Sequence, residues 1–195
     1  MANVTRRFMA DPVGFLRTIP CSCPAQFIGL RTLRLKIEYD PDDLPVAQIR
    51  TPNHGEDGTQ FHLLGWMNED VSTGYLNSGA NYFFTGPLTG CTFAVDKNWY
   101  EPHVLHVNYT HHGAMDVGAM RATANWEMYE DTSILRWTDT PNITVVESHN
   151  RPEDERYNIF GVRGYLGWTF YQQVTRIVGN GNLQVRALYK LDTAF

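Results

Sequence analysis

The feature that most constrains the fold is a pair of short apolar segments joined by four turn-forming residues. The segments are residues 175–178 and 183–186, and the turn between them reads Gly-Asn-Gly-Asn at positions 179–182. β-Branched and aliphatic residues favour strands, whereas Gly and Asn readily adopt the positive φ angles of tight hairpin turns. The pattern predicts an antiparallel β-hairpin, so a sheet is the starting point for the fold.

Several other segments also have the character of strands. Residues 33–39 alternate apolar and charged side chains, which predicts a half-buried strand with Leu33, Leu35, Ile37 and Tyr39 facing inward. A high aromatic content of 13% points the same way, because aromatic residues are enriched in sheets. Further strands are expected at residues 46–49, 61–67, 81–85, 92–95, 99–109, 134–137, 143–146, 157–160 and 165–176.

Helical signals are few. Residues 116–131 form the best helical candidate, with Asp116 placed to cap the first turn. Residues 1–30 are punctuated by prolines and are expected to hold loops and one short turn of helix, and residues 68–80 are expected to be loop. The prediction is therefore α+β: a single domain, residues 1–195, built as a sandwich of mixed β-sheets with flanking helices.

Charge and cysteine usage exclude several functional classes. A formal net charge of −5 argues against general nucleic-acid binding and against binding to anionic membranes. We see no signal peptide and no run of about 20 apolar residues that would span a bilayer. The odd set Cys21, Cys23 and Cys91 argues against a disulfide framework. Cys21 and Cys23 are expected to be structural thiols, and their spacing is a poor match to a zinc site.

Chemistry is concentrated between residues 83 and 110. Cys91 directly follows a turn containing Gly90, and His106 lies in an alternating apolar run that predicts the neighbouring strand. A thiol and an imidazole that meet across a hairpin can act as nucleophile and base. Thr85, on the preceding strand, can orient the imidazole as a third member, and backbone N–H groups at the Gly90 turn can hold an oxyanion.

Three alternatives stay open at this point. Cys91 can be a buried structural thiol, since free cysteines are among the most buried residues. His103 competes with His106 as the base, although it follows Pro102 and looks like loop; Pro102 also places this segment near a sheet edge or a bulge. A zinc cluster can also be drawn from His103, His106, His111 and His112, but the prediction is that the site holds no metal and needs no cofactor.

Three segments resemble the glutamine deamidase toxins typified by Burkholderia lethal factor, whose catalytic core is shared with the cytotoxic necrotizing factors. Residues 83–91, Phe-Phe-Thr-Gly-Pro-Leu-Thr-Gly-Cys, are similar to the family's Phe-Phe-Thr…Leu-Ser-Gly-Cys segment. Residues 35–40 resemble its Leu-x-Ile-Glu-Phe-Asp strand, and residues 104–108 its Val-x-His-hydrophobic-Asp stretch. Thr89 replaces the motif serine, and Gly86-Pro87 replaces a pair of tyrosines near the site.

The resemblance implies a toxin that converts a chosen glutamine of a host protein to glutamate. Cys91 would be the nucleophile, His106 the base and Thr85 the supporting group, and we expect Thr89, Gly90 and His103 to contact the substrate. The implied partner is the translation initiation helicase eukaryotic initiation factor 4A, whose modification blocks translation, or a Rho-type GTPase. The protein would be a monomer made in the bacterial cytoplasm and then released or delivered to the host cytoplasm.

Two other functional classes remain in view. The same thiol chemistry serves a papain-like protease, which cuts peptide bonds, and a transglutaminase, which passes the acyl group to an amine. A non-enzymatic β-sandwich that binds sugar or protein through its many Tyr and Trp residues is the third alternative. It predicts that the change Cys91→Ser leaves activity intact.

Overall fold

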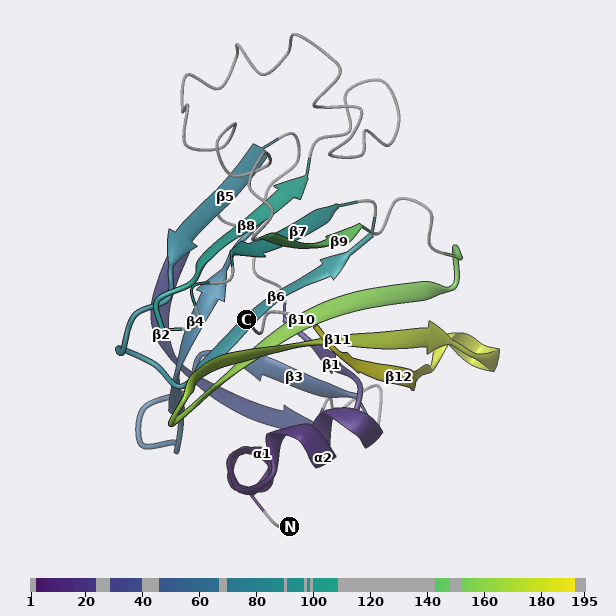
Figure 1. Ribbon diagram of the computed structural model, residues 1–195. Helices are drawn as coiled ribbons and strands as arrows, with labels where there is room; N and C mark the ends of the chain where they lie inside the picture. Colours follow the sequence, from purple (N-terminus) through teal and green to yellow (C-terminus); the bar gives the residue numbers. More distant parts are fainter. Residues whose placement is uncertain are drawn as a thin grey trace, which may run out of the picture.

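The computed structural model describes residues 3–23, 29–39, 46–66, 70–89, 91–96, 98, 100–108, 143–147 and 152–191. Its strands form two sheets, and two short helices flank the larger one (Figure 1). The predicted helix at residues 116–131 and the predicted strand at residues 134–137 lie outside the described residues.

The larger sheet has eight strands and the smaller has four. In spatial order the larger sheet contains β1 (Cys21–Ser22), β3 (Ala47–Arg50), β2 (Leu30–Tyr39), β4 (Thr59–Leu64), β6 (Tyr82–Leu88), β10 (Glu155–Gly164), β11 (Gly167–Ile177) and β12 (Leu183–Lys190). The smaller sheet contains β5 (Asp70–Tyr75), β8 (His103–Asn108), β7 (Thr92–Asp96) and β9 (Ile143–Glu147).

The predicted hairpin is confirmed. β11 and β12 pair antiparallel, and a single 3₁₀ turn at Gly179–Gly181 joins them. Gly181 has a φ of 82°, a value that favours glycine, so the local sequence fits the turn. Most of the larger sheet is antiparallel, but β1 with β3 and β4 with β6 pair in parallel. The expected α+β sandwich of mixed sheets with flanking helices is therefore correct.

The N-terminal segment is more helical than expected. It forms α1 (Val4–Ala10) and α2 (Pro12–Thr18) where we expected loops and a single helical turn. Asn3 caps α1 by accepting from the N–H of Arg6, and Asp11 caps α2 by accepting from the N–H of Gly14. The prolines that suggested loop are compatible with helix here, because Pro12 occupies the first turn, where a missing N–H costs nothing.

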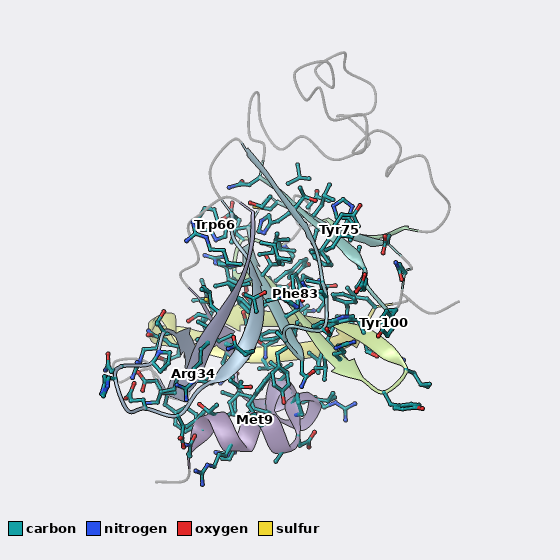
Figure 2. All side chains as sticks on the ribbon, turned by 90° about the vertical axis from the view of Figure 1, so that its left-hand side faces the viewer. Met9, Arg34, Trp66, Tyr75, Phe83 and Tyr100 are labelled. Atoms are coloured by element: carbon teal, nitrogen blue, oxygen red, sulfur yellow. The ribbon has the colours of Figure 1, made fainter. Side chains whose placement is uncertain are left out.

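Each face of the larger sheet carries its own hydrophobic core. Phe83 and Phe84 are adjacent on β6 and point to opposite faces, as successive strand residues must. Phe84 packs with Phe8 and Phe15 of the helices in a cluster we call the helix-side core. Phe83 packs with Phe93 of β7 in a cluster we call the inter-sheet core. Figure 2 shows Phe83 at the centre of the molecule.

Two strand assignments correct the expectation. Residues 70–75 form β5, although we expected loop throughout residues 68–80. Pro102 led us to expect this segment near a sheet edge or a bulge. β8 lies one strand in from the edge, between β5 and β7, and its pairings with both show no register shift. Pro102 sits just before the strand and uses only its carbonyl, which accepts from the N–H of Leu76 at 2.9 Å, so no ladder hydrogen bond is lost.

Among the described residues, no helix has both the length and the apolar character needed to cross a membrane.

Candidate active site

The inter-sheet core contains a buried polar pair contributed by the two sheets. Thr85 lies on β6 of the larger sheet and His106 lies on β8 of the smaller one, and the two strands face each other across the core (Figure 1). The Thr85 hydroxyl oxygen is 2.7 Å from Nδ1 of His106, and both side chains are fully buried. The structure thus brings together two of the three residues that the sequence suggested as a catalytic set.

The hydrogen bonds of Thr85 determine the tautomer of His106. The threonine hydroxyl lies 2.9 Å from the carbonyl oxygen of Leu64, which can only accept. Thr85 therefore donates its single hydrogen to Leu64 and accepts from an N–H at Nδ1 of His106. A neutral imidazole carries one hydrogen, so Nε2 is left with a lone pair and is the basic nitrogen.

The environment of His106 keeps the ring neutral. Burial lowers the pKa of His106 to about 3, because the charged imidazolium loses its hydration in the core. Nε2 is buried and has no hydrogen-bond partner among the described residues. An unpaired polar atom in a core is unfavourable, and a catalytic role is one of the explanations for it, as is an ordered water molecule.

Another buried histidine provides the contrast. His62 on β4 is also fully buried, yet Nδ1 bonds the hydroxyl of Thr32 at 2.8 Å and Nε2 lies 3.0 Å from the carbonyl of Asn77. Both of its nitrogens are satisfied, as in a structural histidine. His106 differs because Nδ1 is hydrogen-bonded to Thr85 while Nε2 has no hydrogen-bond partner among the described residues.

Cys91 lies on the same face of the smaller sheet as His106. In the register of β7 and β8, Phe93 is directly opposite His106, and Cys91 precedes Phe93 by two residues. Side chains two apart on an extended chain share a face, which makes Cys91 the diagonal neighbour of His106, at roughly 7 Å between β-carbons. A thiol and an imidazole can meet over this spacing. Nε2 makes no hydrogen bond to Cys91 in this conformation; in free enzymes such contacts often close only around the substrate.

The burial of Cys91 does not by itself separate the catalytic from the structural interpretation. Cys91 is 4% exposed and belongs to the inter-sheet core. Cys21 and Cys23 are equally buried but lie in the helix-side core, where burial raises the pKa of both thiols, that of Cys23 to about 12. Those two fit the structural role expected of them. Cys91 is distinguished by sharing a face with the basic nitrogen of His106.

His103 lies outside this site. It is three residues from His106 on the same strand, and an odd spacing places it on the opposite face of the sheet. There it stacks on Tyr75 with ring centroids 4.2 Å apart and hydrogen-bonds Thr73. Its expected contact with the substrate at Cys91, and its candidacy as the base, are therefore not supported by the register.

Of the remaining predicted residues, Thr89 lies within the described ranges. Thr89 directly follows β6, and its side chain is exposed. Gly90 lies outside the described residues, so its backbone N–H as an oxyanion donor remains a prediction. His111 and His112 of the zinc alternative also lie outside them, and within the described ranges no three His, Cys, Asp or Glu residues are grouped to hold a metal.

Sequence reasoning missed one residue of the site, Ser72 on β5. It stands directly opposite His106 in the register of β5 and β8, and it is 1% exposed. Its oxygen accepts from the N–H of Gly29 at 3.0 Å. The signal available was the β-branched pair Val71 and Thr73 around a small polar residue, which is a strand-like alternation inside a segment we expected to be loop.

Neither the comparison with protein-family models nor that with curated proteins finds a match to this chain.

Proposed function

We propose that this protein is a glutamine deamidase that hydrolyses the side-chain amide of a chosen glutamine in another protein. The observation that carries the proposal is the half-satisfied His106: Thr85 fixes Nδ1–H at 2.7 Å, and Nε2 remains unpaired on the face that also bears Cys91. A nucleophile beside a base, with a third group orienting the base, is the arrangement that thiol acyl-transfer chemistry requires.

The first half of the reaction forms a thioester. His106 Nε2 takes the proton of the Cys91 thiol, and the resulting charges attract each other, which offsets the burial that disfavours either charge alone. Sγ attacks the carboxamide carbon of the glutamine, and the protonated imidazole gives its proton to the departing ammonia. Acid–base catalysis of this kind contributes roughly 10²–10⁴-fold in rate.

The second half consumes water. The neutral Nε2 accepts a proton from a water molecule, whose oxygen attacks the thioester carbon, and the carbon–sulfur bond breaks to release glutamate. Backbone donors at the Gly90 turn, worth roughly 3–4 kcal/mol at comparable sites, are proposed to hold the oxyanion in both halves. The product carries a negative charge where the substrate was neutral, which is costly in a buried interface.

The nature of the substrate rests on the resemblance to the lethal factor toxins. On that basis we propose a protein of the host cell, either the translation initiation helicase eukaryotic initiation factor 4A or a Rho-type GTPase. Modification of the helicase would block translation. Delivery to the host cytoplasm belongs to the same proposal.

The test uses wild-type protein and three variants incubated with eukaryotic cell lysate. Quantitative mass spectrometry then scores glutamine side chains that gain about 1 Da, the mass change for replacing NH₂ with OH, against new peptide termini, which would mark proteolysis. We expect gains with wild type and none with Cys91→Ser at an unchanged melting temperature. Thr85→Val, which removes the acceptor for Nδ1–H, should lose most activity, and Thr85→Ser should retain it.

Mass gains no larger with wild type than with Cys91→Ser would refute the proposal, and the absence of mass gains and of new termini would favour the binding-module alternative. New termini instead of mass gains would favour the protease.

A further inference from the structure

We propose that Ser72 positions the water molecule that hydrolyses the thioester, and so makes this site a hydrolase rather than a transferase. The inference rests on the proposed function, because it assigns a role within the same Cys91–His106 site.

Ser72 and Cys91 approach His106 from the two strands that flank it. In the smaller sheet β8 lies between β5 and β7, and both neighbours contribute residues to the face that bears the His106 ring. Ser72 is the directly opposed residue on β5, with β-carbons about 5 Å apart, whereas Cys91 is the diagonal neighbour on the β7 side. An acyl group bound to Sγ of Cys91 would therefore lie beside the imidazole of His106. The hydroxyl of Ser72 would lie on the other side of that imidazole.

The hydrogen-bonding capacities of Ser72 and His106 are complementary. The serine oxygen accepts from Gly29, and its hydroxyl hydrogen has no acceptor within the part of the chain that the structure describes. His106 Nε2 is an acceptor with no donor among those residues. A water molecule that accepts from Ser72 and donates to Nε2 satisfies both groups, and buried waters characteristically make two to four such bonds.

The proposal requires this water to reach the thioester carbon from its place beside Nε2. As its oxygen forms a bond to the thioester carbon, one hydrogen moves to Nε2 and the carbonyl electrons move onto oxygen. Collapse of this intermediate breaks the carbon–sulfur bond, and the electron pair returns to Sγ of Cys91. The proton on His106 then returns to the thiolate, and the new carboxylic acid loses its own proton to solvent. Ser72 takes no proton and only holds the water oxygen, so it is a positioning residue.

An external amine does not need this hydrogen bond. Hydroxylamine is a stronger nucleophile than water and can attack the thioester without being anchored by Ser72. Loss of the serine hydroxyl should therefore slow hydrolysis selectively and shift the partition toward aminolysis. A general disturbance of the fold would slow both reactions alike, so the ratio of the two products separates the roles.

The experiment acylates Cys91 with p-nitrophenyl acetate, which needs no knowledge of the natural substrate. The burst of p-nitrophenolate reports thioester formation, and the yields of acetate and acetohydroxamate in hydroxylamine report its fate. We expect Ser72→Ala to keep the burst rate within about twofold and to raise the hydroxamate-to-acetate ratio about tenfold, the effect of one lost hydrogen bond. Thr73→Val, which removes a hydroxyl from the opposite face of β5, should match wild type, and Ser72→Thr should restore the wild-type ratio.

The outcomes distinguish the two proposals. A burst with an unchanged product ratio in Ser72→Ala overturns the role of Ser72 and leaves the deamidase standing. No burst in wild type beyond that of Cys91→Ser overturns the reactive thiol and, with it, this inference. Should Ser72→Ala not fold, Ser72→Gly removes the same hydroxyl and is tested in the same way. The hydroxamate-to-acetate ratio is measured within one sample, so it does not depend on the amount of folded protein.

Discussion

At the scale of single residues, the proposed chemistry depends on the different surroundings of the two nitrogens of His106. Thr85 and the Leu64 carbonyl fix one nitrogen as a donor, and desolvation keeps the ring neutral, so the other nitrogen retains its lone pair. A buried neutral histidine makes the free energy of unfolding depend on pH, because the unfolded chain can bind a proton that the folded chain excludes.

We therefore predict that the free energy of unfolding decreases in acid, and that part of this decrease is due to His106. Burial lowers the pKa of His106 from its usual 6.5 to about 3 in the folded protein. Between those values the unfolded state binds more protons, so the stabilisation is complete above about pH 6.5 and is lost as the pH falls toward 3. In urea unfolding, the wild type should lose about 1 kcal/mol more than His106→Gln between pH 6 and pH 5.

His62 is retained in both proteins, and burial lowers its pKa as well, so its contribution cancels in the difference. Identical pH dependence in the two proteins would mean that the pKa of His106 is the same in the folded and unfolded states, which would contradict desolvation of the ring in the core.

At the scale of elements, the helical layer is fastened to the larger sheet by polar groups inside the helix-side core. Gln173 of β11 accepts from the N–H of Cys21 at 3.0 Å and donates to the carbonyls of Leu16 and Ile19 at 2.7 and 2.8 Å. Its cross-strand neighbour Asn158 donates to the carbonyl of Cys21 at 3.1 Å. These bonds satisfy the backbone where α2 ends and β1 begins, a segment that hydrophobic packing alone would leave with unpaired groups.

Gln173→Leu should therefore destabilise the protein by roughly 2–4 kcal/mol, because it leaves two buried backbone groups and one partly buried carbonyl without this partner. Amide exchange should rise most in α2 and β1. Gln172→Leu provides the matched control, since that side chain is half-buried on the other face of β11, and we expect a change below about 1 kcal/mol. Comparable decreases in the free energy of unfolding of the two variants would show that the hydrogen bonds of Gln173 add nothing to the packing of its side chain.

At the scale of the whole molecule, one sheet supports both cores, and this couples them. β6 sends Phe84 into the helix-side core and Phe83 into the inter-sheet core, and β10 likewise contributes Phe160 to the first and Ile159 to the second. Disruption of either core disturbs strands that the other requires, so the described layers should unfold together.

Phe8→Ala and Phe93→Ala test this coupling from the two sides. Each removes a ring that is at most 1% exposed, from the helix-side and inter-sheet cores respectively, and each should cost about 3–5 kcal/mol. Calorimetry should show a single transition in both variants, with calorimetric and van't Hoff enthalpies in agreement. A separate early transition in Phe8→Ala alone would indicate that the helical layer folds independently.

The sequence predicted those features that depend on neighbouring residues. The β11–β12 hairpin follows from its turn residues, and the inward face of β2 follows from alternation, with Leu35 and Ile37 buried as expected. It predicted only one helical turn where α1 and α2 form, because the prolines were interpreted as loop. It missed β5 because Gly74 and its polar neighbours are not typical of a strand. These errors concern short elements, whose formation is decided by the surfaces against which they pack.

By itself, the amino-acid sequence determined the β-rich α+β class and a short set of candidate site residues, because alternation, turn chemistry and residue type are local properties. Only the tertiary structure decided which of those side chains meet. Register placed His106 with Cys91 and turned His103 to the other face, and the packing of two sheets brought Thr85 to Nδ1. Contacts between strands that are distant in sequence depend on strand pairing and burial. A short stretch of sequence does not specify which distant strand it will pair with.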